Sequence, residues 1–338
     1  MCGIAGIINK SKPAPKEIIQ KMCDVMIHRG PDEEGFFVNC NVALGMRRLK
    51  VIDISSGSQP IFNEDKSVVV IFNGEIYNYQ ELRKSLVKKG HRFYTYSDTE
   101  VIVHLYEEYG ENCVNYLNGM FAIALWNEKE KELLLFRDRL GEKPLHYSIT
   151  DQGIIFSSEI KSMLCNKDVS NELDNEGIYR YFSFYCVPAP LTIYKGIKKL
   201  PPGHYLKYKM GKIEIKEYWD FSYRPDFKKT EEEFSVTLHH LLVKSLKKRL
   251  ISDVPLGAFL SGGIDSSIVV GLMSKILDKP VKTFSIGFEE DRYNELEYAR
   301  IIAKTFKTEH HEFVVKPSTV NLIEKLLGFF DEPFGGPS

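Results

Sequence analysis

The sequence predicts two domains of different fold class, an α+β domain followed by an α/β domain with a parallel sheet. Its 338 residues suit two domains, at a rough average of about 150 residues each. Short apolar runs with helical segments between them fill residues 1–215, which indicates α+β layers. Strand and helix patterns alternate over residues 233–338, which is typical of a parallel α/β sheet. Residues 216–232 pass from aromatic, proline-bearing sequence to charged sequence and are interpreted as a linker.

Composition excludes several classes of function. The chain is 43% hydrophobic and 27% charged, as in ordinary globular proteins. Its net charge of −1 provides no basic field, so no nucleic-acid partner is expected. No apolar run reaches the roughly 18–20 residues needed to span a membrane, so no membrane partner is expected either. Six scattered cysteines form no CxxC pair, which indicates neither a zinc cage nor a disulfide framework and favours a cytoplasmic location.

In the first domain, short apolar runs rich in β-branched residues predict strands. They lie at residues 3–8, 41–46, 67–72, 119–126, 132–137 and 153–158. The run FAIALWNEKEKELLLFRD predicts a hairpin across its polar centre. Helical periods cover residues 17–28 and 98–110, and the second ends at Gly110. The first period places one stripe of apolar side chains on a single face, namely Ile18, Ile19, Met22, Val25 and Met26.

In the second domain, a capping box predicts where the first helix begins. Thr230 followed by Glu233 has the capping-box spacing, and the helix continues from Phe234 to Leu250. The predicted strands are then VPLGAFL, VKTFSIGF and HHEFVV, separated by two helices. A last helix is expected through Leu327.

The loop SGGIDSS stands where a strand ends and a helix begins. Such a point offers free backbone N–H groups and the positive end of a helix dipole, which suit an anion. Gly262 and Gly263 permit close approach of a ligand to the backbone, and Asp265 is a candidate Mg²⁺ ligand. Without GK[ST], this is not the loop that serves γ-phosphate transfer. The alternative is that the loop is only a turn.

The chain begins MCGIAGIIN, which places a cysteine at position two. Once Met1 is removed, Cys2 carries both its thiol, with a pKa of about 8.5, and a free α-amino group, with a pKa of about 7.7–8.0. One residue then holds a nucleophile and a base. The alternative is that Cys2 is merely a small apolar residue at the start of a buried strand.

Nine segments together resemble the glutamine-hydrolysing asparagine synthetase family. They are MCGIAG, HRGPD, RLKVIDIS, FNGEIYNY, SDTE, GMFAIALW, RDRLGEKPLHY, LPPGHYL and LSGGIDSS, and they span nearly the whole chain. The resemblance implies an N-terminal-nucleophile glutaminase domain, with two sheets sandwiched between helices, and a partial ATP-pyrophosphatase-type domain. It also implies that Cys2 releases ammonia from glutamine. ATP would then adenylate aspartate with release of pyrophosphate, and ammonia would displace AMP to give asparagine.

The resemblance also implies a role for individual residues. Catalysis would fall to Cys2 and to two groups that stabilise the oxyanion, the Asn73 side chain and the Gly74 backbone N–H. Arg48 would clamp the carboxylate of glutamine, and Val51 would offer a backbone carbonyl. Glu75 and Asp98 would hold the ammonium group. The segment HRGPD, with Arg29, is expected to support the site rather than to react.

For ATP, the family positions lie in the phosphate loop and the following strand. They are Leu260, Ser261, Gly262, Gly263, Asp265, Ser266 and Ile286. Leu260 and Ile286 would hold adenosine, residues 261–266 would wrap pyrophosphate, and Asp265 would contribute to Mg²⁺ binding. The expected small-molecule partners are glutamine, aspartate and ATP, and a homodimer is the assembly considered.

The chain departs from the family pattern in its second domain. A later loop of the SG(D/E)G(S/G)DE kind, which completes the ATP and aspartate pocket in the family, is not found in the sequence. We therefore expect a fragment or a truncated chain, with working glutaminase and impaired synthetase activity. Two alternatives stay open: a related amidotransferase that acts on another carboxylate, and a non-catalytic module that senses glutamine or a nucleotide. The intact glutamine-site residues argue against lactam-forming relatives, which do not need glutamine.

Overall fold

The chain forms two compact units in a computed structural model that describes residues 1–288, 294–315, 328–333 and 335. Unit 1 comprises Met1–Ser222 and Gly328–Ser338, and unit 2 comprises Tyr223–Leu327. The sequence predicts that residues 328–338 belong to the second domain, whereas in the structure they belong to unit 1. Asp331 accepts a hydrogen bond from the Ile160 N–H at 2.6 Å, and Glu332 pairs with Lys199 at 2.6 Å. These contacts attach the segment to unit 1.

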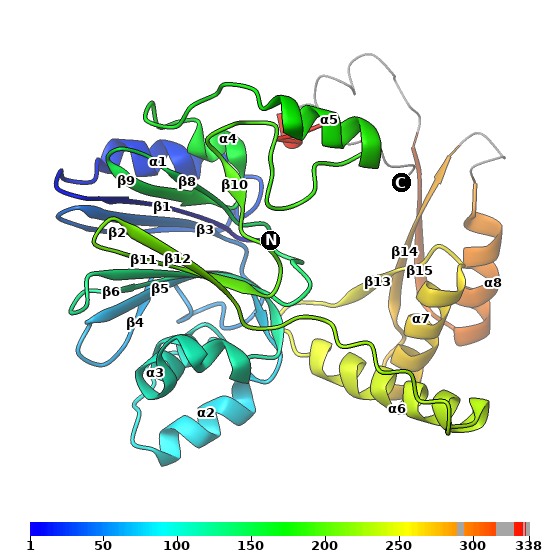
Figure 1. The fold of residues 1–338 in the computed structure, drawn as a ribbon. Helices are drawn as coiled ribbons and strands as arrows, with labels where there is room; N and C mark the ends of the chain where they lie inside the picture. The colour runs from blue at the N-terminus through cyan, green and yellow to red at the C-terminus, as the bar shows by residue number, and fades with distance from the viewer. Residues whose placement is uncertain (289–293, 316–327, 334, 336–338) are drawn as a thin grey trace. The chain divides into compact units, whose positions relative to one another are not determined.

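Unit 1 is a sandwich of two six-stranded antiparallel sheets between helices (Figure 1). The first sheet has the order β10 (Lys198–Lys199), β8 (His146–Ile149), β9 (Gly153–Ser157), β1 (Gly3–Asn9), β3 (Val42–Arg48), β2 (Glu33–Asn39). The second has the order β12 (Lys212–Glu217), β11 (His204–Lys209), β7 (Glu132–Arg137), β6 (Gly119–Asn127), β5 (Val68–Ile76), β4 (Ile61–Phe62). The helices of unit 1 are α1 (Lys16–Asp24), α2 (Tyr79–Lys88), α3 (Glu100–Tyr109), η1 (Gly110–Tyr116), α4 (Ile160–Met163) and α5 (Asn175–Phe184).

Two apolar layers hold unit 1 together. Ile4 and Ile8 of β1 point between the sheets, into a core shared with strands of the second sheet. Ala5 and Ile7 alternate to the other face and pack under α1 and α4. Because both faces of β1 are buried, its sequence is an uninterrupted apolar run. The strand that follows Cys2 is therefore held in the middle of the sandwich.

The strands predicted for the first domain are confirmed as β1, β3, β5, β6, β7 and β9, and the predicted hairpin is the antiparallel pair β6–β7. Helix α3 ends where predicted, before Gly110 with its φ of +55°. Helix α1, however, ends at Asp24, and the side chain of Val25 is 39% exposed. The prediction that the helix continues through Val25 and Met26 to residue 28 is wrong, because α1 ends at Asp24 and Val25 is its C-cap residue.

Unit 2 is a three-stranded parallel sheet with helices, as the alternating pattern predicts (Figure 1). Its strands are β13 (Gly257–Phe259), β14 (Lys282–Phe288) and β15 (Glu309–Val315), and its helices are α6 (Glu231–Arg249), α7 (Ile264–Ile276) and α8 (Leu296–Phe306). The predicted capping box is present at Thr230 and Glu233. The helix predicted to run through Leu327 lies outside the described residues. Among the helices that the structure describes, none is long and apolar enough to cross a membrane.

Candidate functional site

Cys2 lies immediately before β1, the strand paired with β3 on one side and β9 on the other. Its Sγ lies 3.4 Å from the backbone N of Leu49, which donates to it, and 3.7 Å from the carbonyl oxygen of Leu49. Burial raises the pKa of the Cys2 thiol, whereas the Leu49 backbone contact lowers it. A thiol in this setting needs a base before it can act as a nucleophile.

Arg29 fixes the backbone of Cys2. Its Nε donates to the Cys2 carbonyl oxygen at 3.0 Å, and its Nη1 donates to Glu159 at 2.8 Å. His28 also contacts Glu159, at 2.9 Å. The Arg29 side chain of the HRGPD segment thus contacts the main chain of the candidate nucleophile, in keeping with the supporting role expected from the sequence.

Asn73 lies in β5 of the second sheet, opposite Ala122 of β6. The residue is 1% exposed, and neither its Nδ2 nor its Oδ1 has a hydrogen-bond partner among the described residues. Leaving a buried amide unpaired costs about 1–3 kcal/mol, so the position is suited to a ligand that supplies the missing partner. At Gly74 a Cβ would lie 2.1 Å from the Met120 carbonyl oxygen, and only glycine fits this close approach.

Glu75 and Asp98 form a pair of carboxyl groups beside the N-terminus. Burial raises the pKa of both groups, and the negative charge of Asp98 raises the pKa of Glu75 further. Asp98 Oδ2 accepts a hydrogen bond from the Ile76 N–H at 2.8 Å, which fixes its direction. A cation such as an α-ammonium group would offset the repulsion between these two carboxylates.

Arg48 is the last residue of β3 in the first sheet, and hydrogen bonds hold its guanidinium group in place. Its Nη1 donates to Glu33 at 3.0 Å, and its Nη2 donates to the carbonyl oxygens of Ile52 and Asp53 at 3.0 and 2.8 Å. These bonds fix the guanidinium group and shape the loop that contains Val51. The positive charge of Arg48 also lowers the pKa of the Cys2 thiol, although burial outweighs this effect.

Lys143 is a neighbour of the N-terminus that the sequence analysis does not single out. The residue is buried, and its Nζ lies 3.4 Å from the Met1 Sδ. Burial lowers the pKa of its ammonium group, and Glu75 opposes that shift. Asp138 shapes the preceding loop by accepting hydrogen bonds from the backbone N–H groups of Phe121, Leu140, Glu142 and Lys143. In the sequence, the signal for Lys143 is its position within the RDRLGEKPLHY segment.

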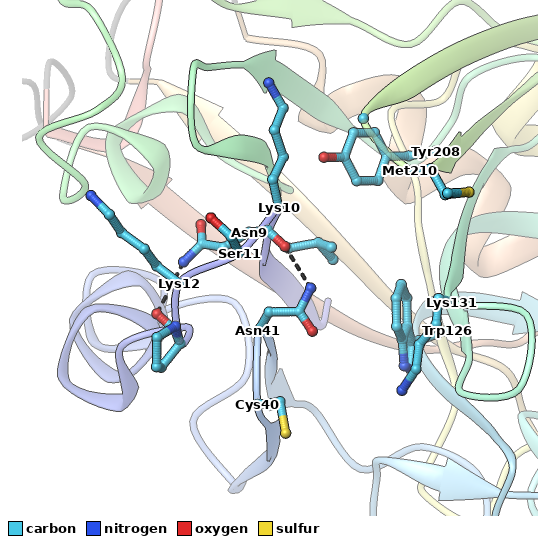
Figure 2. A pocket seen from close by; sticks show the side chains of 13 residues that line it. Asn9, Lys10, Ser11, Lys12, Cys40, Asn41, Trp126, Lys131, Tyr208 and Met210 are labelled. Carbon is cyan, nitrogen blue, oxygen red and sulfur yellow. Dashed lines mark hydrogen bonds between the residues drawn. The ribbon is translucent and has the colours of Figure 1, made fainter.

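A cavity of unit 1 lies at the other end of β1. It measures about 690 Å³ and is lined by Asn9 and the residues after it, together with Trp126 and Tyr208 (Figure 2). Since β1 runs from Gly3 to Asn9, the cavity is separated from Cys2 by the length of a strand, about 20 Å. None of the predicted glutamine-site residues lines it.

In unit 2, the phosphate loop joins β13 to α7. Ser261 Oγ lies 3.1 Å from Ser266 Oγ, and Ser267 Oγ donates to the Gly263 carbonyl oxygen at 2.7 Å. Gly262 has a φ of +83°, and a Cβ there would lie 2.5 Å from the Tyr298 Cβ. The loop therefore requires glycine at this position, and α7 begins at Ile264, where its N-cap residue Gly263 provides no side-chain cap. Its first N–H groups remain available to an anion.

Three of the predicted ATP-site residues share one small pocket. Leu260, Ser261 and Ile286 line a cavity of about 200 Å³ beside the loop. Leu260 is buried, and its N–H donates to the Phe284 carbonyl oxygen at 2.9 Å. Asp265 lies in the first turn of α7, where its carboxylate is exposed.

Comparisons with known proteins agree with both units. The glutamine amidotransferase domain family matches residues 1–219, and the asparagine synthase family matches residues 237–338. A putative glutamine-hydrolysing asparagine synthetase 2 of Methanocaldococcus jannaschii is 40% identical, over 99% of this chain and 69% of its own length. The glutamine-hydrolysing asparagine synthetase 1 of Bacillus subtilis is 39% identical, over all of this chain and 54% of its own length.

The chain belongs to the glutamine-hydrolysing asparagine synthetase family.

Like other members of this family, the chain joins a glutamine amidotransferase domain to an asparagine synthase domain. It spans about half the length of the Bacillus relative and about two thirds of the archaeal one. A solved structure described as the allosteric regulatory enzyme of purine biosynthesis matches with a TM-score of 0.50 and 16% identity, covering 96% of this chain and 70% of that chain. This likeness concerns the fold alone, and it agrees with the sandwich of unit 1.

Proposed function

We propose that this chain hydrolyses glutamine at Cys2 and delivers the ammonia to an ATP-dependent synthesis of asparagine from aspartate. The observation that carries the proposal is the buried amide of Asn73, which has no hydrogen-bond partner among the described residues and lies two residues from Glu75, whose charge acts on the Cys2 thiol. The family match and the glycine-dependent phosphate loop of unit 2 support the second reaction.

Hydrolysis begins once Met1 has been removed. The α-amine of Cys2 accepts the thiol proton, and the sulfur attacks the carboxamide carbon of glutamine. Asn73 Nδ2 and the Gly74 N–H stabilise the oxyanion. The C–N bond then breaks, and the amine returns the proton to the leaving nitrogen as ammonia forms. Water attacks the thioester, which releases glutamate and restores the thiol.

The environment of the N-terminus favours this use of the amine. Burial lowers the pKa of the amino group at the chain start, and the nearby positive charges of Arg29 and Lys143 lower it further. The α-amine of Cys2 lies one residue further along the chain, so we expect burial to lower its pKa in the same direction. A neutral amine is the form that can accept the thiol proton.

The carboxyl pair and Arg48 select the amino-acid end of the substrate. We propose that Glu75 and Asp98 bind the α-ammonium of glutamine and that Arg48 binds its α-carboxylate, with the Val51 carbonyl as a further acceptor. The cation then offsets the repulsion that raises the pKa of Glu75. This arrangement orients the carboxamide toward Cys2 and Asn73.

In unit 2, we propose that Ser261, Gly262, Gly263 and Ser266 hold the pyrophosphate portion of ATP, and that Leu260 and Ile286 contact adenosine. The uncapped N-terminus of α7 and the glycine at positive φ fit a phosphate group. Asp265 would help to hold Mg²⁺, which would neutralise phosphate charge when bound. The acceptor is adenylated with release of pyrophosphate, and ammonia displaces AMP.

Labelling of the purified full chain tests the first reaction. Intact-mass spectrometry should show loss of Met1, and 6-diazo-5-oxo-norleucine should label Cys2. Cys2→Ala should reduce ammonia release from glutamine to background, whereas Cys40→Ala, which removes an exposed cysteine, should leave it unchanged. Retention of Met1 in active protein, or activity in Cys2→Ala, would refute the assignment.

Acceptor assays separate the remaining possibilities. AMP and asparagine formed from glutamine, ATP and aspartate would support the full reaction. AMP formed only with another carboxylate would identify an amidotransferase of different specificity, and ammonia release without AMP would leave glutaminase activity alone. A homodimer and a cytoplasmic location stay predictions, which light scattering and cell fractionation can test.

A further inference from the structure

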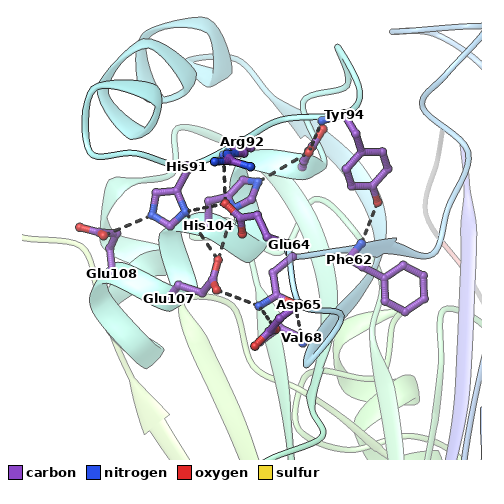
Figure 3. Close-up of polar contacts among 12 residues, drawn as sticks. Phe62, Glu64, Asp65, Val68, His91, Arg92, Tyr94, His104, Glu107 and Glu108 are labelled. Carbon is purple, nitrogen blue, oxygen red and sulfur yellow. Dashed lines mark hydrogen bonds and ion pairs between the residues drawn. The ribbon is translucent and has the colours of Figure 1, made fainter.

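A cluster of two histidines and two glutamates lies in unit 1 on elements distinct from the catalytic residues (Figure 3). Glu64 belongs to the turn between β4 and β5, and His91 follows α2. His104 and Glu107 are three residues apart on α3 and therefore share one face of that helix. One ligand atom from each of the four side chains lies within 4.8 Å of the other three.

Several distances inside the cluster are close to the separation of ligands around one ion, and two of these contacts, His91 to Glu64 and His104 to Glu107, also serve as hydrogen bonds in the absence of an ion. His104 Nδ1 lies 3.3 Å from both Glu64 Oε2 and Glu107 Oε2. His91 Nδ1 lies 3.3 Å from Glu64 Oε1 and 3.7 Å from Glu107 Oε2. An N–H···O hydrogen bond is usually about 2.7–3.2 Å long and points at one acceptor, whereas each of these nitrogens faces two carboxylates. Four ligands bound at about 2.0–2.2 Å in a tetrahedron are separated by about 3.3–3.6 Å.

Three of the four side chains, His91, Glu64 and Glu107, are held by outer hydrogen bonds as metal ligands usually are. His91 Nε2 lies 3.2 Å from Glu108 Oε1, and His104 Nε2 lies 3.6 Å from Glu100 Oε1. The carboxylate behind His91 fixes that ring and favours coordination through Nδ1, whereas His104 Nε2 lies near Glu100 without a hydrogen bond to it. The ligating carboxylates are also anchored, because Asn63 Nδ2 donates to Glu107 at 2.8 Å and the Arg92 N–H donates to Glu64 at 3.0 Å.

Charge and burial favour a divalent cation of the first transition row. Two carboxylates and two neutral imidazoles carry a charge of −2, which a divalent ion neutralises. The side chain of His104 is fully buried and that of His91 is 12% exposed, while Glu64 and Glu107 reach solvent and leave a route for entry. Imidazole ligands favour zinc over magnesium or calcium, and four protein ligands leave no open position, as in structural zinc sites.

We propose that Glu64, His91, His104 and Glu107 form a structural zinc site. The ion would connect the β4–β5 turn, the segment after α2, and α3. Glu100, behind His104, also accepts hydrogen bonds from the N–H groups of Tyr94 and Thr95, which begin the segment leading to Asp98. Zinc would therefore stabilise the part of unit 1 that carries this carboxylate.

Zinc titration of the chelator-treated full chain tests the proposal. We expect one tightly bound Zn²⁺ per chain in competition with a chromophoric chelator, and a melting temperature that rises with zinc concentration. X-ray absorption should give nitrogen and oxygen ligands at about 2.0–2.2 Å with no sulfur. No binding, or a sulfur ligand, would refute the site.

Single substitutions test which side chains bind the zinc ion. His91→Ala and Glu107→Gln should each abolish tight binding, and Glu108→Ala should weaken it about 10–100-fold, as expected for loss of an outer partner. His204→Ala and His311→Ala remove histidines that are elsewhere in the chain and should leave the affinity unchanged. Circular dichroism checks that each variant is folded. Unchanged affinity in folded Glu107→Gln and His91→Ala, or loss of binding in a control, would assign the zinc to another place.

Discussion

The two candidate sites of this chain differ in how completely the protein surrounds them. The glutamine site draws residues from both sheets of unit 1, and Arg48, Asn73 and Asp98 are all buried. The phosphate loop of unit 2 lies in a more open setting, with Ile264 79% exposed and Ile286 55% exposed. Stabilising an oxyanion requires donors that are fixed before reaction, whereas a phosphate can be held by a helix N-terminus and a glycine loop. The first site thus depends on tertiary packing and the second on local backbone shape.

The largest effect expected from this contrast is at Asn73. Asn73→Ala removes the side-chain donor proposed for the oxyanion and should lower the kcat for glutamine hydrolysis about 10²–10³-fold, with ATP binding unaffected. Steady-state ammonia release measures the change, and Asn115→Ala, on an exposed position of η1, is the control. A rise in KM at constant kcat would mean that Asn73 only binds substrate.

A smaller effect is expected at Gly262. Gly262→Ala places a Cβ on a residue with a φ of +83° and within 2.6 Å of the Ala299 N. The loop must change shape, which costs about 1–2 kcal/mol, so ATP affinity should fall about tenfold or more in calorimetry. In Gly263→Ala the nearest atom would be 3.4 Å away, and the loss should be smaller. Equal losses, or a fall in glutaminase activity, would contradict the local role of the loop.

The smallest effect concerns stability and pH at Glu75. Burial and Asp98 hold the pKa of Glu75 above its ordinary value, so the folded state binds a proton that the unfolded state releases above about pH 4.3. This contribution to stability is therefore lost as pH rises toward the folded pKa. Glu75→Gln should change little at pH 4 and gain about 1–2 kcal/mol at pH 8.

Urea unfolding at pH 4, 6 and 8 measures this gain, with Glu81→Gln, an exposed change on α2, as the control. The same variant should bind glutamine more weakly. A stability gain that is independent of pH would show that the carboxyl pair is not the cause.

Local patterns predicted much of the fold, because they depend on residues close in sequence. The apolar runs that became β1, β3 and β5 were visible, as was the capping box at Thr230. Polar-rich strands were not visible. Strand β2, with the sequence EEGFFVN, is partly exposed and has no clear alternation of apolar and polar residues. The attachment of Asp331 to the N-terminus of α4 joins residues far apart in the chain, which no local pattern reveals.

The difference between local patterns and long-range contacts also applies to the candidate sites. The glutamine-site positions came from the resemblance to known sequences, and the structure brings Cys2, Glu75 and Arg48 close enough to influence one another's charge. Lys143 was missed because a lysine in a loop is usually exposed, and only the packed structure shows it beside the N-terminus. Of the zinc cluster, only the spacing of His104 and Glu107 on one helix could be read locally. Glu64 and His91 join them through tertiary contacts.

The position of Cys2 ahead of the central strand has a practical consequence for anyone who produces this protein. A purification tag fused before Met1 would leave a peptide bond on the nitrogen that the proposed mechanism requires as a free amine. Such a preparation would fold, since β1 begins only at Gly3, and yet would be inert toward glutamine until a protease exposed Cys2. Under the proposed mechanism, tag removal would therefore switch activity on once and would need no mutation.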